Sequence, residues 1–129
     1  MKRVLYLSFA LLTLFIWGCS EDEAAETPSF LSLEERVINN TSFSFFIRAA
    51  EGAGNGTVHF LILGKSDPAP TTSDIRSNSA TTRVSLSGGG TTIGSTLGVS
   101  PNTTYMVYAF MEVDGVEGEL VSLEITTDA

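Results

Sequence analysis

Residues 105–126 of the chain are YMVYAFMEVDGVEGELVSLEIT, two strand-like segments on either side of Asp114-Gly115. An Asp-Gly pair between alternating hydrophobic segments is one of the strongest short signals for a tight hairpin, because the turn needs positive φ angles. Side chains two apart share one face of a strand. We therefore predict a final hairpin of strands 105–113 and 118–126. Its inward side chains are Tyr105, Val107, Ala109 and Met111, followed by Val121, Leu123 and Ile125.

The same alternation continues upstream, and no part of the chain after Pro28 shows a sustained apolar repeat of helical period. Segment 42–49 places Phe43, Phe45, Ile47 and Ala49 on one face, which we assign to the core. Segment 57–63 is apolar on both faces, as is typical of a central strand. Further strands are expected at 30–37, 82–86 and 91–97. About seven short strands in roughly 100 residues predict an all-β Greek-key sandwich.

Two connections stand out between these strands. The segment 64–80 contains Pro68 and Pro70 and then 71–75, where a hydroxyl side chain can cap one or two helical turns. The segment 87–90, Ser-Gly-Gly-Gly, lacks the lysine and helix of a phosphate-binding loop, so we interpret it as a flexible hairpin between 82–86 and 91–97.

Residues 97–109, LGVSPNTTYMVYA, resemble the fibronectin type III pattern, in which a leucine and a Pro/Asn/Thr turn precede the tyrosine that opens the penultimate strand. The resemblance extends over residues 41–127 and implies an immunoglobulin/fibronectin type III-like sandwich. It also implies that Tyr105 forms a tyrosine corner, with its hydroxyl bonded to backbone upstream. The core tryptophan of the family is absent, and so is an Arg-Gly-Asp triplet. The fold by itself fixes no activity.

Residues 1–18 have the composition of a signal peptide, with Lys2 and Arg3 before an uncharged stretch from 4 to 17. As a helix this stretch rises about 21 Å, short of the roughly 30 Å hydrocarbon core, so a permanent transmembrane helix is the weaker interpretation. Residues 16–19, Ile-Trp-Gly-Cys, resemble the lipobox of bacterial lipoproteins, although Trp17 stands where a small residue is usual. The resemblance implies lipidation of Cys19, the only cysteine; the alternatives are a free buried thiol or an uncleaved anchor.

Charge separates the next segment, 19–27, from the domain that we assign to residues 28–129. The chain has seven Lys/Arg and fifteen Asp/Glu, and since Lys2 and Arg3 precede Cys19, the remainder has a formal net charge of −10. This charge argues against nucleic acid as a partner and leaves lipid as the means of membrane contact. Four acids follow Cys19 closely and resemble an export signal for surface lipoproteins, or form an extended solvated tether. We expect an outer-membrane location, surface-exposed rather than facing the periplasm.

Side chains suited to catalysis are scarce. His59 is the only histidine, and it has neither a second imidazole nor a cysteine partner for a zinc site or a nucleophilic triad. The acids at 112, 114, 117 and 119 surround the last hairpin, where a solvated tip is the ordinary outcome and a weak calcium site the remaining alternative. We therefore predict no catalytic residues, no metal site and no cofactor, and a protein that is not an enzyme.

One surface suggests binding. If residues 60 and 105 point inward, the outer faces of two neighbouring strands carry His59, Leu61, Tyr108 and Phe110. Either the 64–80 insertion covers this face, which we favour, or the face is an aromatic platform for a sugar ring or a partner protein. The leading hypothesis is a lipid-anchored, non-catalytic binding or adhesion module. The rivals are an accessory glycan-binding lipoprotein of a polysaccharide capture system and a purely structural spacer.

Overall fold

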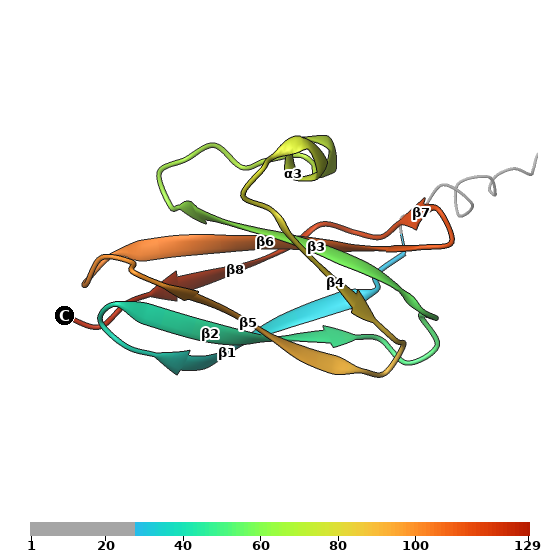
Figure 1. The fold of residues 1–129 in the computed structure, drawn as a ribbon, viewed down its shortest axis with the longest axis horizontal. Helices are drawn as coiled ribbons and strands as arrows, with labels where there is room; N and C mark the ends of the chain where they lie inside the picture. Colours follow the sequence, from blue (N-terminus) through green and yellow to red (C-terminus); the bar gives the residue numbers. More distant parts are fainter. Residues whose placement is uncertain (1–27) are drawn as a thin grey trace, which may run out of the picture.

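The computed structural model describes residues 28–129, which fold into two antiparallel β-sheets packed face to face (Figure 1). The signal peptide, Cys19 and the acidic tether predicted from the sequence lie outside the described residues. The strands are β1 (Leu31–Ile38), β2 (Ser42–Ala49), β3 (Gly56–Gly64), β4 (Thr82–Leu86), β5 (Thr91–Leu97), β6 (Thr104–Val113), β7 (Val116–Glu117) and β8 (Val121–Thr126), and the one helix among these residues is α3 (Thr72–Ser77).

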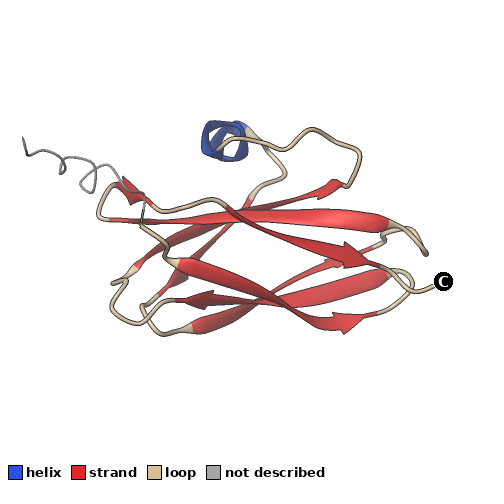
Figure 2. Ribbon diagram, turned by 180° about the vertical axis from the view of Figure 1, so that it is seen from behind, coloured by secondary structure: helices blue, strands red, loops and turns tan. Residues whose placement is uncertain are grey.

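The strands are arranged as a Greek-key sandwich. Sheet A has the order β1-β2-β5, and sheet B has the order β4-β3-β6, with β7 and β8 pairing in turn with β6. The two sheets are visible as separate layers in Figure 2. The predicted all-β sandwich is confirmed, and so is the central place of β3, which lies between β4 and β6.

The core lies between the sheets and is built by the alternation that the sequence shows. On β2 the alternate side chains Phe43, Phe45, Ile47 and Ala49 are buried, and those of Phe45 and Ile47 are fully inaccessible to solvent. Val107, Ala109 and Met111 of β6 are also fully buried against it. Phe45 stands edge-on to Phe60 with ring centroids 5.5 Å apart. Burial of these apolar side chains is the main favourable term for folding, at about 25 cal/mol per Å².

The final hairpin forms, but its second strand is interrupted. Asp114 and Gly115 have φ angles of 51° and 80°, and the flanking pairs Glu112–Glu117 and Val113–Val116 are in register. The sequence predicts a continuous strand over 118–126, but in the structure β7 ends at Glu117, the Gly118 N–H makes one more bond to the Met111 carbonyl at 2.8 Å, and regular pairing with β6 resumes at Val121. The reason is that the chain bends toward the N-terminal segment, where the Glu119 N–H donates to the Pro28 carbonyl at 2.7 Å.

The interpretation of segment 87–90 as a hairpin is wrong. β4 pairs with β3 and β5 pairs with β2, so this segment carries the chain from sheet B to sheet A. The glycines still serve a turn, because Gly89 has a φ angle of 79° and the Gly90 N–H donates to the Ser87 carbonyl at 2.8 Å. Local turn chemistry identifies the reversal but not the sheet that the next strand joins.

The two ends of the sandwich differ in what they carry. At one end, which we call the Pro28 end, the described chain begins and the connections 50–55, 87–90 and 114–115 lie. At the other, the far end, lie the connections 39–41 and 98–103 together with the C-terminus (Figures 1 and 2). The strands run between these two ends, so the position of a residue along its strand determines the end near which it lies.

Candidate functional site

The insertion between β3 and β4 lies on the outer face of sheet B. Thr71 caps α3: its hydroxyl accepts the Asp74 N–H at 3.1 Å, and the Asp74 carboxylate accepts the Thr71 N–H at 2.9 Å. This capping box fixes the start of a helix too short to be stable alone. The helix then directs Ile75, which is fully buried, down onto the sheet. Figure 1 shows α3 above β3 and β6. Its apolar partners there are Leu61, Tyr108 and Phe110.

This packing shows whether the aromatic platform that the sequence suggested is exposed. His59, Leu61, Tyr108 and Phe110 do share one face and come together, but each is no more than 8% exposed. The insertion covers them, as the sequence led us to expect. The four side chains therefore form a second, smaller core and present no binding surface in this arrangement.

A network of polar contacts fastens the insertion to the last hairpin. The Arg76 guanidinium donates to Glu112 at 2.9 Å and to Glu117 at 2.7 Å, and the Thr72 hydroxyl donates to Glu117 at 2.8 Å. The hydrogen bonds from Arg76 and then Thr72 lower the pKa of Glu117. Those to Glu117 and Glu112 raise the pKa of Arg76. Two of the four acidic side chains at the last hairpin, Glu112 and Glu117, are thus paired with Arg76.

The other two acids, Asp114 and Glu119, are exposed. Within the described residues there is no group of three or more His, Cys, Asp or Glu side chains placed to share a metal ion.

His59 is enclosed by this network. Its ring stacks on Phe110 with centroids 4.8 Å apart, and its Nε2 lies 3.6 Å from a Glu112 oxygen. Neither ring nitrogen has a hydrogen-bond partner within the domain. Burial lowers the pKa of His59, and the charges of Arg76 and Arg83 lower it further, while Glu112 acts in the opposite direction. The surroundings of the imidazole beneath the insertion therefore favour its neutral form.

Tyr105 lies at the opening of β6 near the far end. Its hydroxyl accepts the Ser100 N–H at 2.9 Å, five residues upstream, and its ring packs on Phe43 with centroids 5.8 Å apart. This is the backbone-to-hydroxyl bond that the family resemblance implies for a tyrosine corner. The contact ties the β5–β6 connection to the core, which is a structural role.

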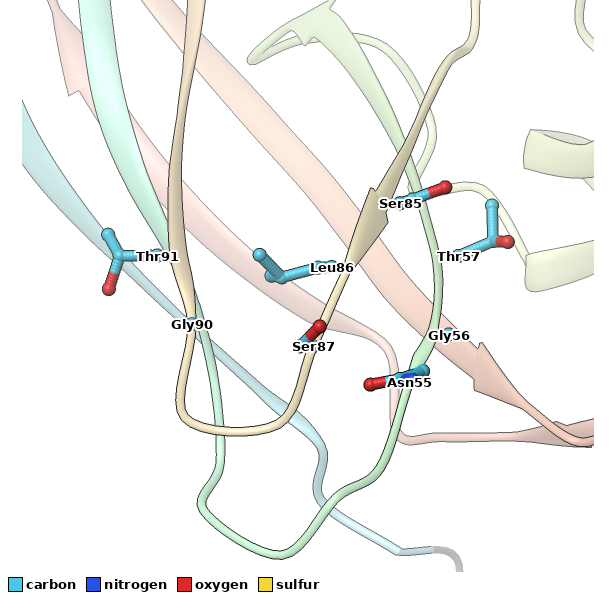
Figure 3. Close-up of a pocket in the computed structure, with 8 residues that line it drawn as sticks. All are labelled: Asn55, Gly56, Thr57, Ser85, Leu86, Ser87, Gly90 and Thr91. Carbon is cyan, nitrogen blue, oxygen red and sulfur yellow. The ribbon is translucent and has the colours of Figure 1, made fainter.

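An open cleft of about 640 Å³ lies at the Pro28 end, where the edge strands β4 and β5 part (Figure 3). In Figure 3 the Leu86 side chain points from β4 toward β5, whereas Thr57 and Ser85 point away from it. Few polar side chains therefore point into the cleft, and we assign no ligand to it. Its lining residues are Asn55, Gly56, Thr57, Ser85, Leu86, Ser87, Gly90 and Thr91.

A smaller hollow of about 200 Å³ lies at the far end of sheet A, and we call it the far-end groove. Its rim includes two exposed aliphatic side chains, Val37 at 45% and Leu97 at 83%. Both lie on the outer face of sheet A, because Val37 pairs with Ser44 and Leu97 pairs with Ser42. The groove is lined by Arg36, Val37, Asn39, Ser42, Phe43, Ser44, Ser95, Thr96 and Leu97.

The groove is not apparent from the sequence for a local reason. β1 has a bulge between Glu35 and Val37, so simple alternation from Leu31 would place Val37 inward, whereas the structure places it outward. The available signal was on β5: the pairing that buries Phe43 and Phe45 leaves Ile93 and Leu97 on the outer face, 51% and 83% exposed. The alternation of inward and outward side chains along β5 is by itself enough to indicate this exposed surface.

Within residues 28–129, no helix has the length and apolar character needed to cross a membrane.

The sequence matches no protein-family model and no curated protein. Among solved structures, the chain is similar to a computationally redesigned β-sandwich protein, with a TM-score of 0.55, 21% identity, and coverage of 81% of this chain and 97% of that one. It is also similar to a myokine, with a TM-score of 0.56, 10% identity, and coverage of 80% and 100%. The FN5 domain of Drosophila Lar matches with a TM-score of 0.40, 12% identity, and coverage of 81% and 99%.

The two matches with TM-scores above 0.5 show the fold alone. The strand orders β1-β2-β5 and β4-β3-β6-β8 are those of an immunoglobulin/fibronectin type III-like β-sandwich. A domain of this kind is compatible with a non-catalytic binding or spacer module.

Proposed function

We propose that this chain is a lipid-anchored protein of the bacterial cell envelope, displayed at the cell surface, whose β-sandwich is a non-catalytic binding or adhesion module. The anchor is Cys19, which follows a basic and then apolar leader, and the acidic residues after it supply the tether. Two or more acyl chains hold a protein stably in a membrane, each buried methylene adding about 0.8 kcal/mol.

The observation that carries the binding proposal is the position of the far-end groove. The tether joins the domain at Pro28, and the groove with Val37 and Leu97 lies at the opposite end of the strands. A domain held at Pro28 therefore presents this groove away from the bilayer. Exposed aliphatic side chains that gather on one face of a strongly acidic chain are more readily explained by contact with a partner than by a spacer role.

A protein is a better fit to this surface than a sugar. Sugar rings stack on open aromatic faces, and the aromatic side chains proposed for that purpose, Tyr108 and Phe110, are buried beneath α3. The aromatic residue on the outer face of sheet A, Phe46, is covered by the Arg48 guanidinium 4.6 Å above its ring. Aliphatic contacts from Val37 and Leu97 are typical of protein interfaces.

The anchor and the display are tested on intact cells carrying the full chain with a C-terminal epitope. We expect the wild type in the membrane fraction, with its epitope lost when protease is added to unbroken cells. Cys19→Ala should leave the membrane fraction or accumulate as precursor, and Ser20→Ala, the adjacent control, should behave as the wild type. A wild-type epitope that survives protease until the cells are broken would overturn surface display.

The binding surface is tested with two matched valine variants. Val37 in the groove and Val116 on the last hairpin are 45% and 50% exposed. We expect Val37→Ser to reduce attachment of intact cells to serum-protein-coated surfaces and Val116→Ser to leave it unchanged, with equal surface levels. Equal attachment by the two variants would remove the groove from the proposal and favour the spacer.

A further inference from the structure

The sandwich has four sheet edges, and three of them carry features that prevent pairing with another strand. Charges, bulges and short length are the usual means by which an edge is protected. β1 carries Glu34, Glu35 and Arg36 together with its bulge. β4 is five residues long and contains Arg83, and β8 carries Glu124 after a two-residue β7.

The remaining edge, β5, has none of these features. Its sequence is TTIGSTL, with no charge and no proline, and its register with β2 is unbroken from Thr91 to Leu97. No other strand of residues 28–129 pairs with it, and two large aliphatic side chains, Ile93 and Leu97, are exposed on it. Every second residue of an antiparallel strand directs its N–H and C=O to the far side, so β5 offers a row of free backbone groups.

Charge indicates what occupies this edge. Residues 28–129 contain five Lys/Arg and eleven Asp/Glu, a formal net charge of −6, so two copies of the domain repel each other overall. No charged residue occurs between Arg83 and Glu112, and β5 lies within that span. The β5 edge is therefore a surface on which two copies can meet without bringing carboxylates together, and each copy supplies the same uncharged, β-branched strand.

We infer that β5 pairs with β5 of a second copy of this chain in the antiparallel sense. Antiparallel pairing is the mode that a two-fold axis permits, because the same residues then meet on both sides. With the axis at Gly94, Ile93 lies opposite Ser95 of the second copy, and Leu97 lies opposite Thr91. Leu97 then lies diagonal to Ile93 of the second copy, within reach of it. The two copies of sheet A become one continuous sheet.

Site-directed cross-linking of the full chain, purified in excess non-ionic detergent, tests this register. We expect Ile93→Cys combined with Ser95→Cys to give a two-chain product with a short bis-maleimide. The matched control is Ser32→Cys combined with Glu34→Cys, which has the same spacing on the outer face of the β1 edge. It should give only the background of the wild type, whose single cysteine is Cys19.

A charge variant tests the same edge without cysteines. Ser95→Glu places two carboxylates close to the axis, so we expect it to raise the dissociation constant of the dimer about tenfold or more in sedimentation experiments. Ser32→Glu should leave the constant unchanged, and circular dichroism at concentrations below the dissociation constant, where each protein is monomeric, should show the same melting temperature for both. Equal cross-linking by the two cysteine pairs, a wild type that stays monomeric, or a Ser95→Glu protein that dimerises as the wild type would overturn the inference.

Discussion

Replacing Ile75 by alanine tests whether the insertion is part of the cooperative fold. Ile75 is fully buried and contacts the cluster of Leu61, Tyr108 and Phe110. Truncation of a buried isoleucine to alanine costs about 2–5 kcal/mol, depending on how far the site can collapse. Because α3 is six residues long and lies on the outside of the sheet, it can settle partly into the space, so we expect about 2–3 kcal/mol.

The loss is measured by urea unfolding of the purified protein, followed by circular dichroism. In a domain of this length, each kcal/mol of lost stability lowers the melting temperature by about 4–8 °C. Val116→Ala, at a half-exposed position on the last hairpin, is the control and should stay within about 0.5 kcal/mol of the wild type. If Ile75→Ala matches this control, the insertion does not stabilise sheet B and our account of the buried face is refuted.

Three further substitutions probe separate parts of the fold. Tyr105→Phe keeps the ring but removes the acceptor of the Ser100 N–H, and should cost about 1 kcal/mol in urea unfolding; no loss would contradict the corner. Gly94→Ala should cost about 1–3 kcal/mol, because its Cβ would lie 2.4 Å from the Phe45 ring. His59→Phe should flatten the pH dependence of stability. Since the pKa of His59 is lowered in the fold from 6.5, the unfolded chain binds the proton more readily, so wild-type stability is complete above about pH 6.5 and falls as the pH drops below it. An unchanged pH profile in the variant would show that His59 is not the group responsible.

Much of the fold could be predicted because one face of each strand is buried. The alternation on β2 and β6 identified Phe43, Phe45, Val107 and Met111 as core residues, and all are buried. The Asp114-Gly115 turn needed no knowledge of the rest of the chain, since its positive φ angles are a local property. Signals of this kind depend only on neighbouring residues, so they hold whichever strands pair in the sheets.

Features that depend on distant segments could not be predicted. The strand is interrupted after Gly118 because the chain bends toward Pro28, and only a glycine fits there, since a Cβ would lie 2.5 Å from the Phe30 ring, far away in sequence. Arg76 meets Glu112 and Glu117 only because the insertion folds back across the sheet. The bulge in β1 that turns Val37 outward has no sequence mark as clear as a glycine.

The placement of the two chain ends has a mechanical consequence. β1 leaves Pro28 and β8 leads to Ala129, and both strands run from the Pro28 end to the far end (Figure 1). A pull applied between these two ends acts along the strands, perpendicular to the hydrogen bonds of the ladders. The bonds of β1 with β2 and of β8 with β6 then resist the load together, whereas a pull on two ends at the same side would open them one after another.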